Sequence, residues 1–368
     1  MEFMRKQNNR KDHPRILCLT QDTQSIGGIG NYFKCLYPHF NLAVDYLING
    51  TRLSQQGFVK NLRRFFRDYV RFYHKIRRYD LILINTSLRL KSLLRDMIFN
   101  LLCRVSGTRR LVFIHGWNWA FAEAIERLLP GFIRFALFRA DAIAVLALEF
   151  ENALRRWGYR GPVYRLTTFV DEHETAAFTE AKVRSRARKP GLRILFLARL
   201  DPGKGLLPSL NAVNQVKKRY PDVQLDVAGI GPQLQRARSF AQEYTVPAVF
   251  HGFVRGAEKI ALLQKADVLL LPTTYGEGMP TSILEGMAFG CAVITCPAGG
   301  IKDFFEHGKM GFLCSRPDPG MISDFLIQLA ADQELRIRMG LFNFNYSRQH
   351  FTVRHALNRL EKILTEMA

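Results

Sequence analysis

The chain has 368 residues, of which 48% are hydrophobic and 23% charged, so it is long enough for two globular cores of comparable size. Its 53 Lys and Arg residues against 32 Asp and Glu residues give a net charge of +21, which indicates a polyanionic partner: phosphate groups, an anionic membrane surface or nucleic acid. The six cysteines form no CxxC pair or zinc-like cluster. The basic N-terminus lacks the apolar core of a signal peptide, and no apolar run approaches the roughly 20 residues of a transmembrane helix. We therefore expect a cytoplasmic protein with reduced thiols, which could still lie on the inner face of the cell membrane.

Short apolar segments alternate with longer helical patterns along the chain. Continuous apolar strands separated by helices are typical of parallel sheets covered on both faces. The predicted strands are 15–20, 42–47, 80–85, 110–115, 142–147 and 163–166 in the first half, and 192–198, 223–229, 248–253, 267–272 and 291–296 in the second.

Two such series predict the α/β class with two doubly wound, Rossmann-like domains. We place the N-terminal domain at 1–172 and the C-terminal domain at 191–348. The polar segment between them, 173–190, carries a basic run and is predicted to be a linker. Residues 349–368 form a final helix, whose apolar side chains recur at helical spacing and need an apolar surface to cover.

Residues 60–78 contain eight Lys or Arg residues and one acid. Aromatic and aliphatic side chains recur at steps of three and four, while the cations follow the other face, which predicts an amphipathic helix. Two interpretations stay open: the aromatic face packs on the first sheet with the arginines solvated, or the helix contacts an anionic membrane. Nucleic acid is disfavoured, because no recognised binding motif accompanies the charge.

The stretch YGEGMPTSILEGMAFG places Glu277 in a loop and Glu285 in the first turn of a helix that starts near Thr281. Ser282 and Glu285 fit a capping box, which offers a purely structural role for Glu285. The loop follows a predicted parallel strand, and ligands of open α/β sheets bind at that end. A helix start there suits a phosphate, while carboxylates suit the hydroxyl groups of a polyol.

A second cluster follows the strand 192–198. Arg199 comes directly after the strand, and Lys204 lies in a Pro-Gly turn that opens the next helix. Each alone is more typical of a surface cation, but two fixed cations at a strand end can clamp a diphosphate and neutralise the charge that develops on it.

These motifs occur in a recognisable order. Arg199 and Lys204, AGIGPQ (228–233), HGFV (251–254), the E-x7-E of Glu277 and Glu285, and HGKMGFLC (307–314) resemble the retaining nucleotide-sugar glycosyltransferases of family four. The likeness covers nearly all of 192–350 and is looser over 1–170. It implies the GT-B fold, in which two Rossmann-like domains face a central cleft and the C-terminal helix crosses back to the N-terminal domain.

The resemblance also implies roles in the C-terminal domain. Arg199 and Lys204 would bind the donor diphosphate, Glu277 the sugar hydroxyls and Glu285 the ribose hydroxyls. The remaining donor-binding positions would be the wall beside the base and the backbone that lines the sugar and phosphate, namely Phe253, Val254, Gly278, Met279, Pro280 and Thr281.

In the first half, SIGGIGNYF lacks the third glycine of a dinucleotide fingerprint, and an ordinary strand-to-helix turn is the alternative. Its resemblance to the family's glycine loop makes Gly27 and Gly28 donor-site candidates. His115 ends a predicted strand, and a lone loop histidine is usually only hydrogen bonded to its neighbours. By the same resemblance, His115 would contact the transferred sugar or orient the acceptor.

The predicted function is retaining transfer of a hexose-type sugar from a nucleoside diphosphate sugar to an acceptor hydroxyl, with no metal or cofactor. The acceptor is expected to be a saccharide or a lipid-linked saccharide of cell-envelope polysaccharide assembly. Three alternatives stay open: a phosphorolytic relative, a noncatalytic sugar-nucleotide binder, and a basic nucleic-acid-binding protein.

Overall fold

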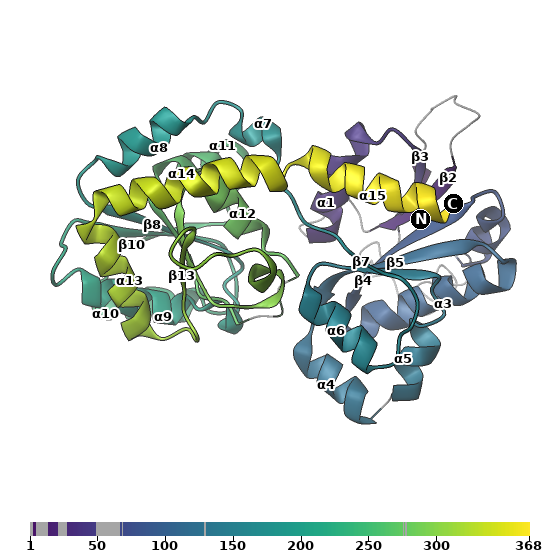
Figure 1. Ribbon diagram of the computed structural model, residues 1–368. Coiled ribbons are helices and arrows are strands. Elements are labelled where there is room, and N and C mark those ends of the chain that lie inside the picture. The colour runs from purple at the N-terminus through teal and green to yellow at the C-terminus, as the bar shows by residue number, and fades with distance from the viewer. Residues whose placement is uncertain are drawn as a thin grey trace. The chain divides into compact units, whose positions relative to one another are not determined.

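The computed structural model describes residues 3–4, 14–20, 28–48, 67, 69–128, 130–274, 276 and 278–368. The chain folds into two compact units (Figure 1). Unit 1 comprises Met1–Thr167 together with Val353–Ala368, and unit 2 comprises Thr168–Thr352. Each unit contains its own sheet and its own core.

The sheet of unit 1 has the strand order β1-β3-β2-β4-β5-β6-β7. Every neighbouring pair is parallel except β1 with β3. Its central strands are buried except near their ends, which explains why the sequence shows them as continuous apolar runs. The strands are β1 (Phe3–Met4), β2 (Arg15–Thr20), β3 (Ala43–Ile48), β4 (Leu81–Leu88), β5 (Arg109–Trp117), β6 (Ala142–Val145) and β7 (Val163–Arg165).

Helices flank this sheet. They are α1 (Gly28–Leu36), α3 (Leu90–Ser106), α4 (Trp119–Leu128), α5 (Pro130–Ala136), α6 (Leu148–Arg156) and α15 (Val353–Met367). Residues 69–76 are also helical. Tyr69, Phe72 and Ile76 are buried there, and the first two pack on Phe99 of α3. In the described part of the predicted basic helix, the aromatic face thus lies in the core, while 60–66 fall outside the described residues.

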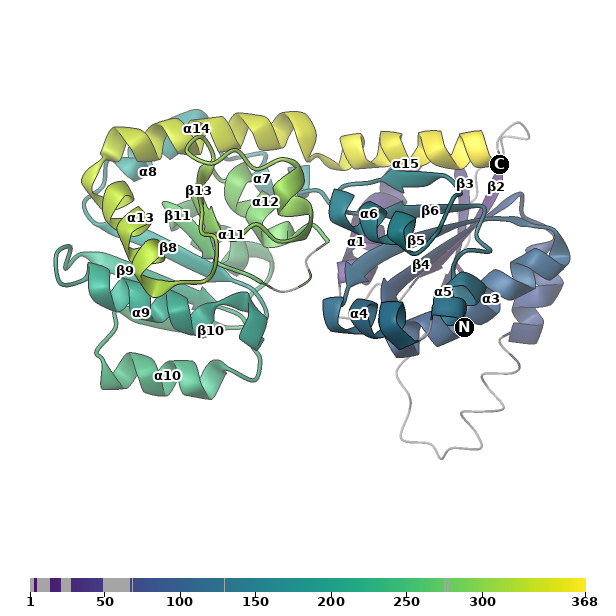
Figure 2. The same cartoon turned by 60° about the horizontal axis from the view of Figure 1, so that its bottom comes forward.

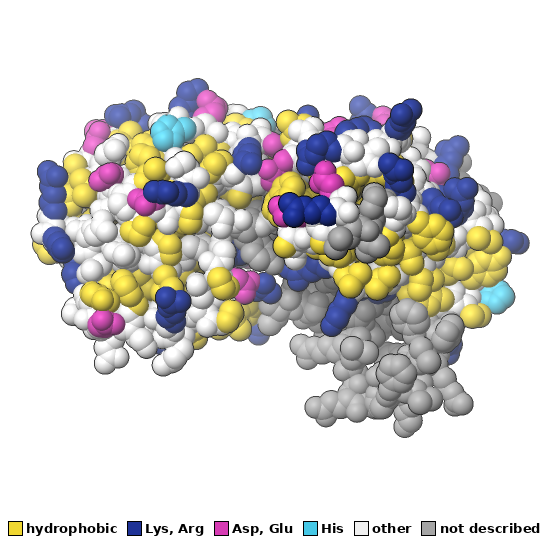
Figure 3. All heavy atoms as spheres, turned by 90° about the horizontal axis from the view of Figure 1, so that it is seen from below, with side chains coloured by type: hydrophobic (Ala, Val, Ile, Leu, Met, Phe, Trp, Pro, Cys, Tyr) yellow, Lys and Arg dark blue, Asp and Glu magenta, His cyan; other side chains and the backbone are white. Residues whose placement is uncertain are grey.

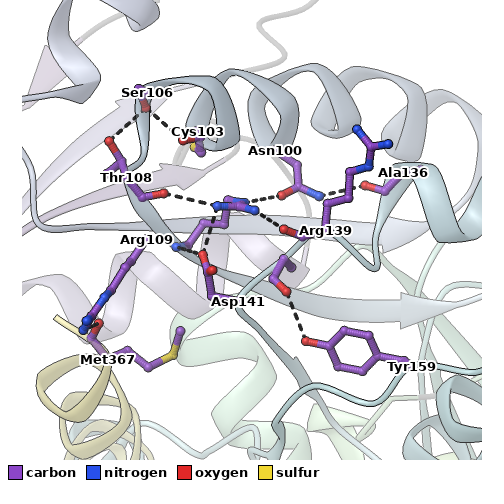
Figure 4. A network of polar contacts seen from close by, with 12 residues as sticks. Asn100, Cys103, Ser106, Thr108, Arg109, Ala136, Arg139, Asp141, Tyr159 and Met367 are labelled. Carbon is purple, nitrogen blue, oxygen red and sulfur yellow. Dashed lines mark hydrogen bonds and ion pairs between the residues drawn. The ribbon is translucent and has the colours of Figure 1, made fainter.

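A network of polar contacts joins α3, β5 and the residue before β6 (Figure 4). Arg110 is 5% exposed, donates to Oδ1 of Asn100 at 2.7 Å and pairs with the carboxylate of Asp141 at 3.0 Å. It also donates to the carbonyl oxygens of Thr108 and Arg139. Because these groups satisfy the guanidinium, its charge is compensated inside the unit.

The sheet of unit 2 is entirely parallel, in the order β10-β9-β8-β11-β12-β13. Its strands are β8 (Leu192–Leu197), β9 (Val223–Ala228), β10 (Ala248–Gly252), β11 (Val268–Leu271), β12 (Ala292–Thr295) and β13 (Gly311–Leu313). Its helices are α7 (Glu172–Thr175), α8 (Glu180–Ala187), α9 (Leu206–Val216), α10 (Leu234–Glu243), α11 (Gly256–Lys265), α12 (Thr281–Ala288), α13 (Pro319–Ala331) and α14 (Gln333–His350).

The segment 173–190, predicted as a linker, differs from that expectation. Its residues form most of α7 and all of α8, and they belong to unit 2. The physical reason is Arg186, which is 8% exposed. Its guanidinium donates to the carbonyl oxygens of Phe289 and Gly290 and lies 3.5 Å from the carboxylate of Asp267. This buried cation, together with the buried side chains of Val183 and Ala187, attaches α8 to unit 2.

The C-terminal helix returns to unit 1, as predicted (Figure 2). The apolar side of α15 is buried, including Leu360 and Leu364 at 0% exposure. Two hydrogen bonds join it to the rest of unit 1: Glu361 accepts from the backbone N–H of Asn41 at 2.5 Å, and Arg109 donates to the carbonyl of Met367 at 2.9 Å.

Just before this return, the two ends of unit 2 meet. The N–H of Val170 donates to the carbonyl of Phe351 at 2.8 Å, and Val170 forms a parallel bridge with Thr352. The first and last segments of unit 2 are thus hydrogen bonded to each other.

Candidate active site

The loop after β8 carries the two predicted diphosphate ligands. The side chain of Arg199 is 64% exposed and pairs with the carboxylate of Asp201, which is 19% exposed. Lys204 ends a short 3-10 turn (Pro202–Lys204). The next residue, Gly205, has φ +81°, and a Cβ there would lie 2.5 Å from the carbonyl oxygen of Pro272. The turn that presents Lys204 thus requires glycine.

This loop is joined to the loop after β11. The backbone N–H of Thr274 donates to the carbonyl of Gly203 at 2.8 Å. β8 and β11 are neighbouring parallel strands, so both loops leave the same edge of the sheet. That edge is where open α/β sheets bind their ligands.

The predicted donor loop leads from β11 to α12. Gly278, Met279 and Pro280 are buried, and Thr281 begins the helix. The carbonyl of Gly278 accepts from the N–H of Gly300 at 2.7 Å, and that of Met279 accepts from the hydroxyl of Thr168 at 3.2 Å. Glu277 lies outside the described residues.

The predicted capping box is wrong. The residue before α12 is Pro280, with no hydrogen bond from a side chain to the helix start. Ser282 is already the second residue of the helix, so Glu285 lies too far along it to cap.

Glu285 has a different partner. Its carboxylate lies 2.7 Å from Nζ of Lys259 on α11, and the same ammonium lies 2.8 Å from the carboxylate of Glu174 on α7. Burial raises the pKa of Glu285, and Lys259 opposes that shift. Burial alone would lower the pKa of Lys259, but the two carboxylates outweigh it and the pKa is raised. The ammonium is therefore charged and holds Glu285 in place.

The predicted wall beside the base follows β10. Phe253 is 45% exposed, whereas Val254 is 7% exposed. Of these two side chains, only the phenylalanine ring is thus available to a ligand, because the valine side chain is buried in the core.

In unit 1, Gly27 lies outside the described residues and Gly28 begins α1. His115 sits near the end of β5, where the pairing with β4 skips a residue: Thr86 pairs with Ile114, but Ser87 pairs with Gly116. His115 is therefore the extra residue of a β-bulge, a feature that re-aims side chains beside sites. Its Nε2 lies 2.9 Å from Oδ1 of Asn85. Burial lowers the pKa of His115 to about 3, so the imidazole is neutral.

Trp117, two residues after His115, is structural. Trp117 is 2% exposed and stacks on Phe150 with ring centroids 4.5 Å apart, and it also contacts Trp119 and Trp157.

The predicted residues therefore fall into two groups, one in each unit. The sequence reasoning missed three residues that contact the candidates: Asn85, Asp201 and Lys259. Asn85 is the one polar residue in the run LILIN, and that interruption of an apolar strand was a usable signal.

Two kinds of feature are absent from the described part of the chain. No three His, Cys, Asp or Glu side chains gather there as a metal site would require. No helix there is long and apolar enough to cross a bilayer.

The fold matches solved structures. HepE of Anabaena, solved in complex with UDP and glucose, has a TM-score of 0.72 and 18% identity over 96% of this chain and 99% of that one. Sucrose-phosphate synthase from Thermosynechococcus elongatus has a TM-score of 0.74 and 17% identity over 96% and 99%. At such identities the likeness shows the fold alone, which is the expected GT-B fold.

Curated relatives match at higher identity over shorter stretches. The putative colanic acid biosynthesis glycosyltransferase WcaL of Salmonella typhimurium is 34% identical over 214 residues, 55% of this chain and 51% of that protein. The phosphatidyl-myo-inositol mannosyltransferase of Mycobacterium tuberculosis is 32% identical over 155 residues, 41% of each. The matched region thus spans about half of these relatives or less.

The family model "Glycosyl transferases group 1" matches residues 178–343, which make up most of unit 2. That segment contains Arg199, Lys204, the buried donor loop and Glu285. Over that segment, the chain is similar to the group 1 glycosyl transferases.

Proposed function

We propose that this protein is a retaining hexosyltransferase, which moves a hexose-type sugar from a nucleoside diphosphate sugar to an acceptor hydroxyl. The observation that carries the proposal is the joined pair of loops in unit 2, which presents Arg199 and Lys204 at the same sheet edge as the start of α12. Two cations and a helix start suit a diphosphate. The UDP and glucose in the complex of HepE, which has the same fold, support this donor class.

In the proposed reaction, the bond between the sugar carbon and the diphosphate oxygen breaks while the acceptor oxygen bonds to the same face of that carbon. Negative charge then grows on the diphosphate, and Arg199 and Lys204 stabilise it without a metal. The leaving oxygen takes the proton of the acceptor hydroxyl. Glu277 would hold the sugar hydroxyls and Glu285 the ribose.

Release of nucleoside diphosphate from a panel of nucleotide sugars tests the proposal, with NMR of the product to read the anomeric configuration. Arg199→Ala and Lys204→Ala should each lower kcat/KM by about a hundredfold. Arg193→Ala is the matched control, because it removes an exposed cation from β8 near the opposite end of the strand. Release that requires inorganic phosphate and yields a sugar phosphate would instead identify a phosphorylase.

For the acceptor, we propose a lipid-linked or envelope polysaccharide intermediate, reached from the inner face of the cell membrane. The names of the two curated relatives support this class. On unit 1, Val70, Leu90 and Val105 are 54%, 50% and 71% exposed, and Arg67 and Arg71 are exposed near Val70 in the sequence. Figure 3 shows hydrophobic side chains among Lys and Arg on one face of this unit. Mixed apolar and cationic surfaces suit anionic bilayers.

Flotation with vesicles containing anionic lipid tests the membrane contact. Arg67→Glu with Arg71→Glu should lower the bound fraction, whereas the same charge change at exposed Lys218 and Arg219 of unit 2 should not. Equal flotation of both variants and the wild type would remove this surface from the proposal.

A further inference from the structure

Asn85 forms polar contacts with both neighbouring strands, β2 and β5, at the carboxyl end of the unit 1 sheet. On β4, its Nδ2 donates to the carbonyl of Leu19 at 2.9 Å and lies 3.3 Å from the sulfur of Cys18, both on β2. Its Oδ1 lies 2.9 Å from Nε2 of His115 on β5. The side chain is 1% exposed, so no solvent competes for these contacts.

The direction of these bonds follows from the chemistry of the groups. A carbonyl oxygen can only accept, so the NH₂ end of the Asn85 amide must face Leu19. The amide oxygen then faces His115 and can itself only accept. Nε2 of His115 must therefore carry the proton, which in a neutral imidazole leaves Nδ1 as an acceptor.

The surroundings keep the ring neutral and in place. Rings of Tyr32, Phe33 and Phe113 lie with centroids 5.1, 6.0 and 3.7 Å from that of His115. The titratable groups that face this pair are Tyr32 on α1 and Cys18 on β2, and burial raises the pKa of both. Both are therefore uncharged, and within the described ranges His115 forms no ion pair.

We propose that Asn85 is a positioning residue that fixes His115 in the Nε2-protonated tautomer, so that Nδ1 accepts a hydrogen bond from a hydroxyl of the bound sugar or acceptor. The inference rests on the proposed function, in which His115 contacts one of them. The opposite tautomer would present an N–H at this point. The ligand group must therefore be a donor, and a fluorine in place of that hydroxyl would lose the contact.

Ring ¹⁵N shifts of ¹⁵N-histidine-labelled protein test the tautomer without any turnover. The wild type should show a protonated Nε2 and an unprotonated Nδ1. Cys18→Ala is the control, because it removes the sulfur contact and leaves the bond to Leu19, and it should give the same spectrum. A protonated Nδ1, or an even mixture of tautomers, in the wild type would overturn the proposal.

The pH profile tests the consequence for catalysis. Asn85→Asp keeps an acceptor beside Nε2 but adds a negative charge, which raises the pKa of His115. Turnover should then fall about tenfold for each pH unit below the new pKa, because imidazolium cannot accept a hydrogen bond. A folded Asn85→Asp variant with the wild-type pH profile would contradict the positioning role.

The two readouts separate this inference from the proposed function. A protonated Nε2 with no consumption of any nucleotide sugar refutes the transferase proposal and leaves the tautomer assignment intact. Turnover with a protonated Nδ1 refutes the inference alone.

Discussion

Glu285 owes its environment to a residue on another helix. Lys259 bridges it to Glu174, so two carboxylates share one ammonium. When all three groups are charged, the cluster has a net charge of −1, which leaves carboxylate capacity for ligand hydroxyls. The side chains of Lys259 and Glu285 are 18% and 14% exposed, so their interaction is only partly screened by water.

Lys259→Met should destabilise unit 2 by about 2 to 3 kcal/mol, because it leaves two carboxylates close together without their cation. It should also weaken donor binding, since Glu285 loses the group that holds it. Urea unfolding and KM for the nucleotide sugar measure the two effects. Glu174→Gln is the control: it keeps the Lys259–Glu285 pair and should change KM much less.

His115 predicts a pH dependence of stability. Burial lowers its pKa to about 3 in the folded chain, against about 6.5 in an unfolded one. The unfolded state therefore binds the extra proton first, and the free energy of unfolding should decrease as the pH falls from about 6.5 toward 3. In urea titrations at several pH values, His115→Gln should reduce the dependence of the free energy of unfolding on pH. His74→Gln, at an exposed position, should leave that dependence unchanged. An unchanged slope in His115→Gln would refute the assignment.

At the scale of elements, the loop after β8 depends on one glycine. Gly205 combines φ +81° with the carbonyl of Pro272, which would lie 2.5 Å from any Cβ added there. Gly308 also has a positive φ, +84°, but a Cβ added there would meet nothing within 4 Å. Comparing alanine substitutions at Gly205 and Gly308 therefore separates two costs in unfolding free energy: that of the positive φ, and that of the close contact with Pro272.

Gly308→Ala should cost about 1 kcal/mol of unfolding free energy, the penalty of the left-handed region. Gly205→Ala should cost more and should also raise KM for the donor, because the displaced turn carries Lys204. Thermal unfolding and initial rates measure both. Equal effects of the two variants would mean that the approach to Pro272 does not constrain the loop.

The elements differ in how visible they are in the sequence. Eleven strands were predicted, most of them from apolar runs, although β7 is only three residues long. β1 and β13 were missed, because two and three residues give too little pattern to stand out. Helix α8 was missed as part of unit 2 because its attachment rests on Arg186, whose partners at 267, 289 and 290 are distant in the chain.

The candidate site divides in the same way. Arg199 and Lys204 were predictable from their place after a strand, and His115 from its place at the end of one. One of their partners was also predictable from the sequence, because Asp201 lies two residues after Arg199. The contacts of Asn85 with His115 and of Lys259 with Glu285 were not, because each joins two separate elements. Residue patterns report local structure, whereas these contacts are set by the tertiary fold.

At the scale of the whole molecule, unit 1 is completed by the end of the chain. A chain ending at Thr352 lacks α15, which buries seven side chains and accepts the bond from Arg109. Loss of this apolar contact should destabilise unit 1 by several kcal/mol. Hydrogen exchange should then speed up in α1 and around Asn41, while amides in β8 and β11 of unit 2 keep their protection. Uniformly faster exchange in both units would show that they unfold together.

The bridge between Val170 and the residues around Thr352 has a consequence for the order of synthesis. Unit 2 is an insertion whose ends close on each other, so it can fold on the ribosome as soon as Thr352 has emerged. The first segment of unit 1 is translated before unit 2, but unit 1 cannot complete its folding until α15 has been translated and can cover its surface. The nascent chain therefore exposes that surface throughout the translation of unit 2, and chaperones that bind apolar segments should engage this chain there.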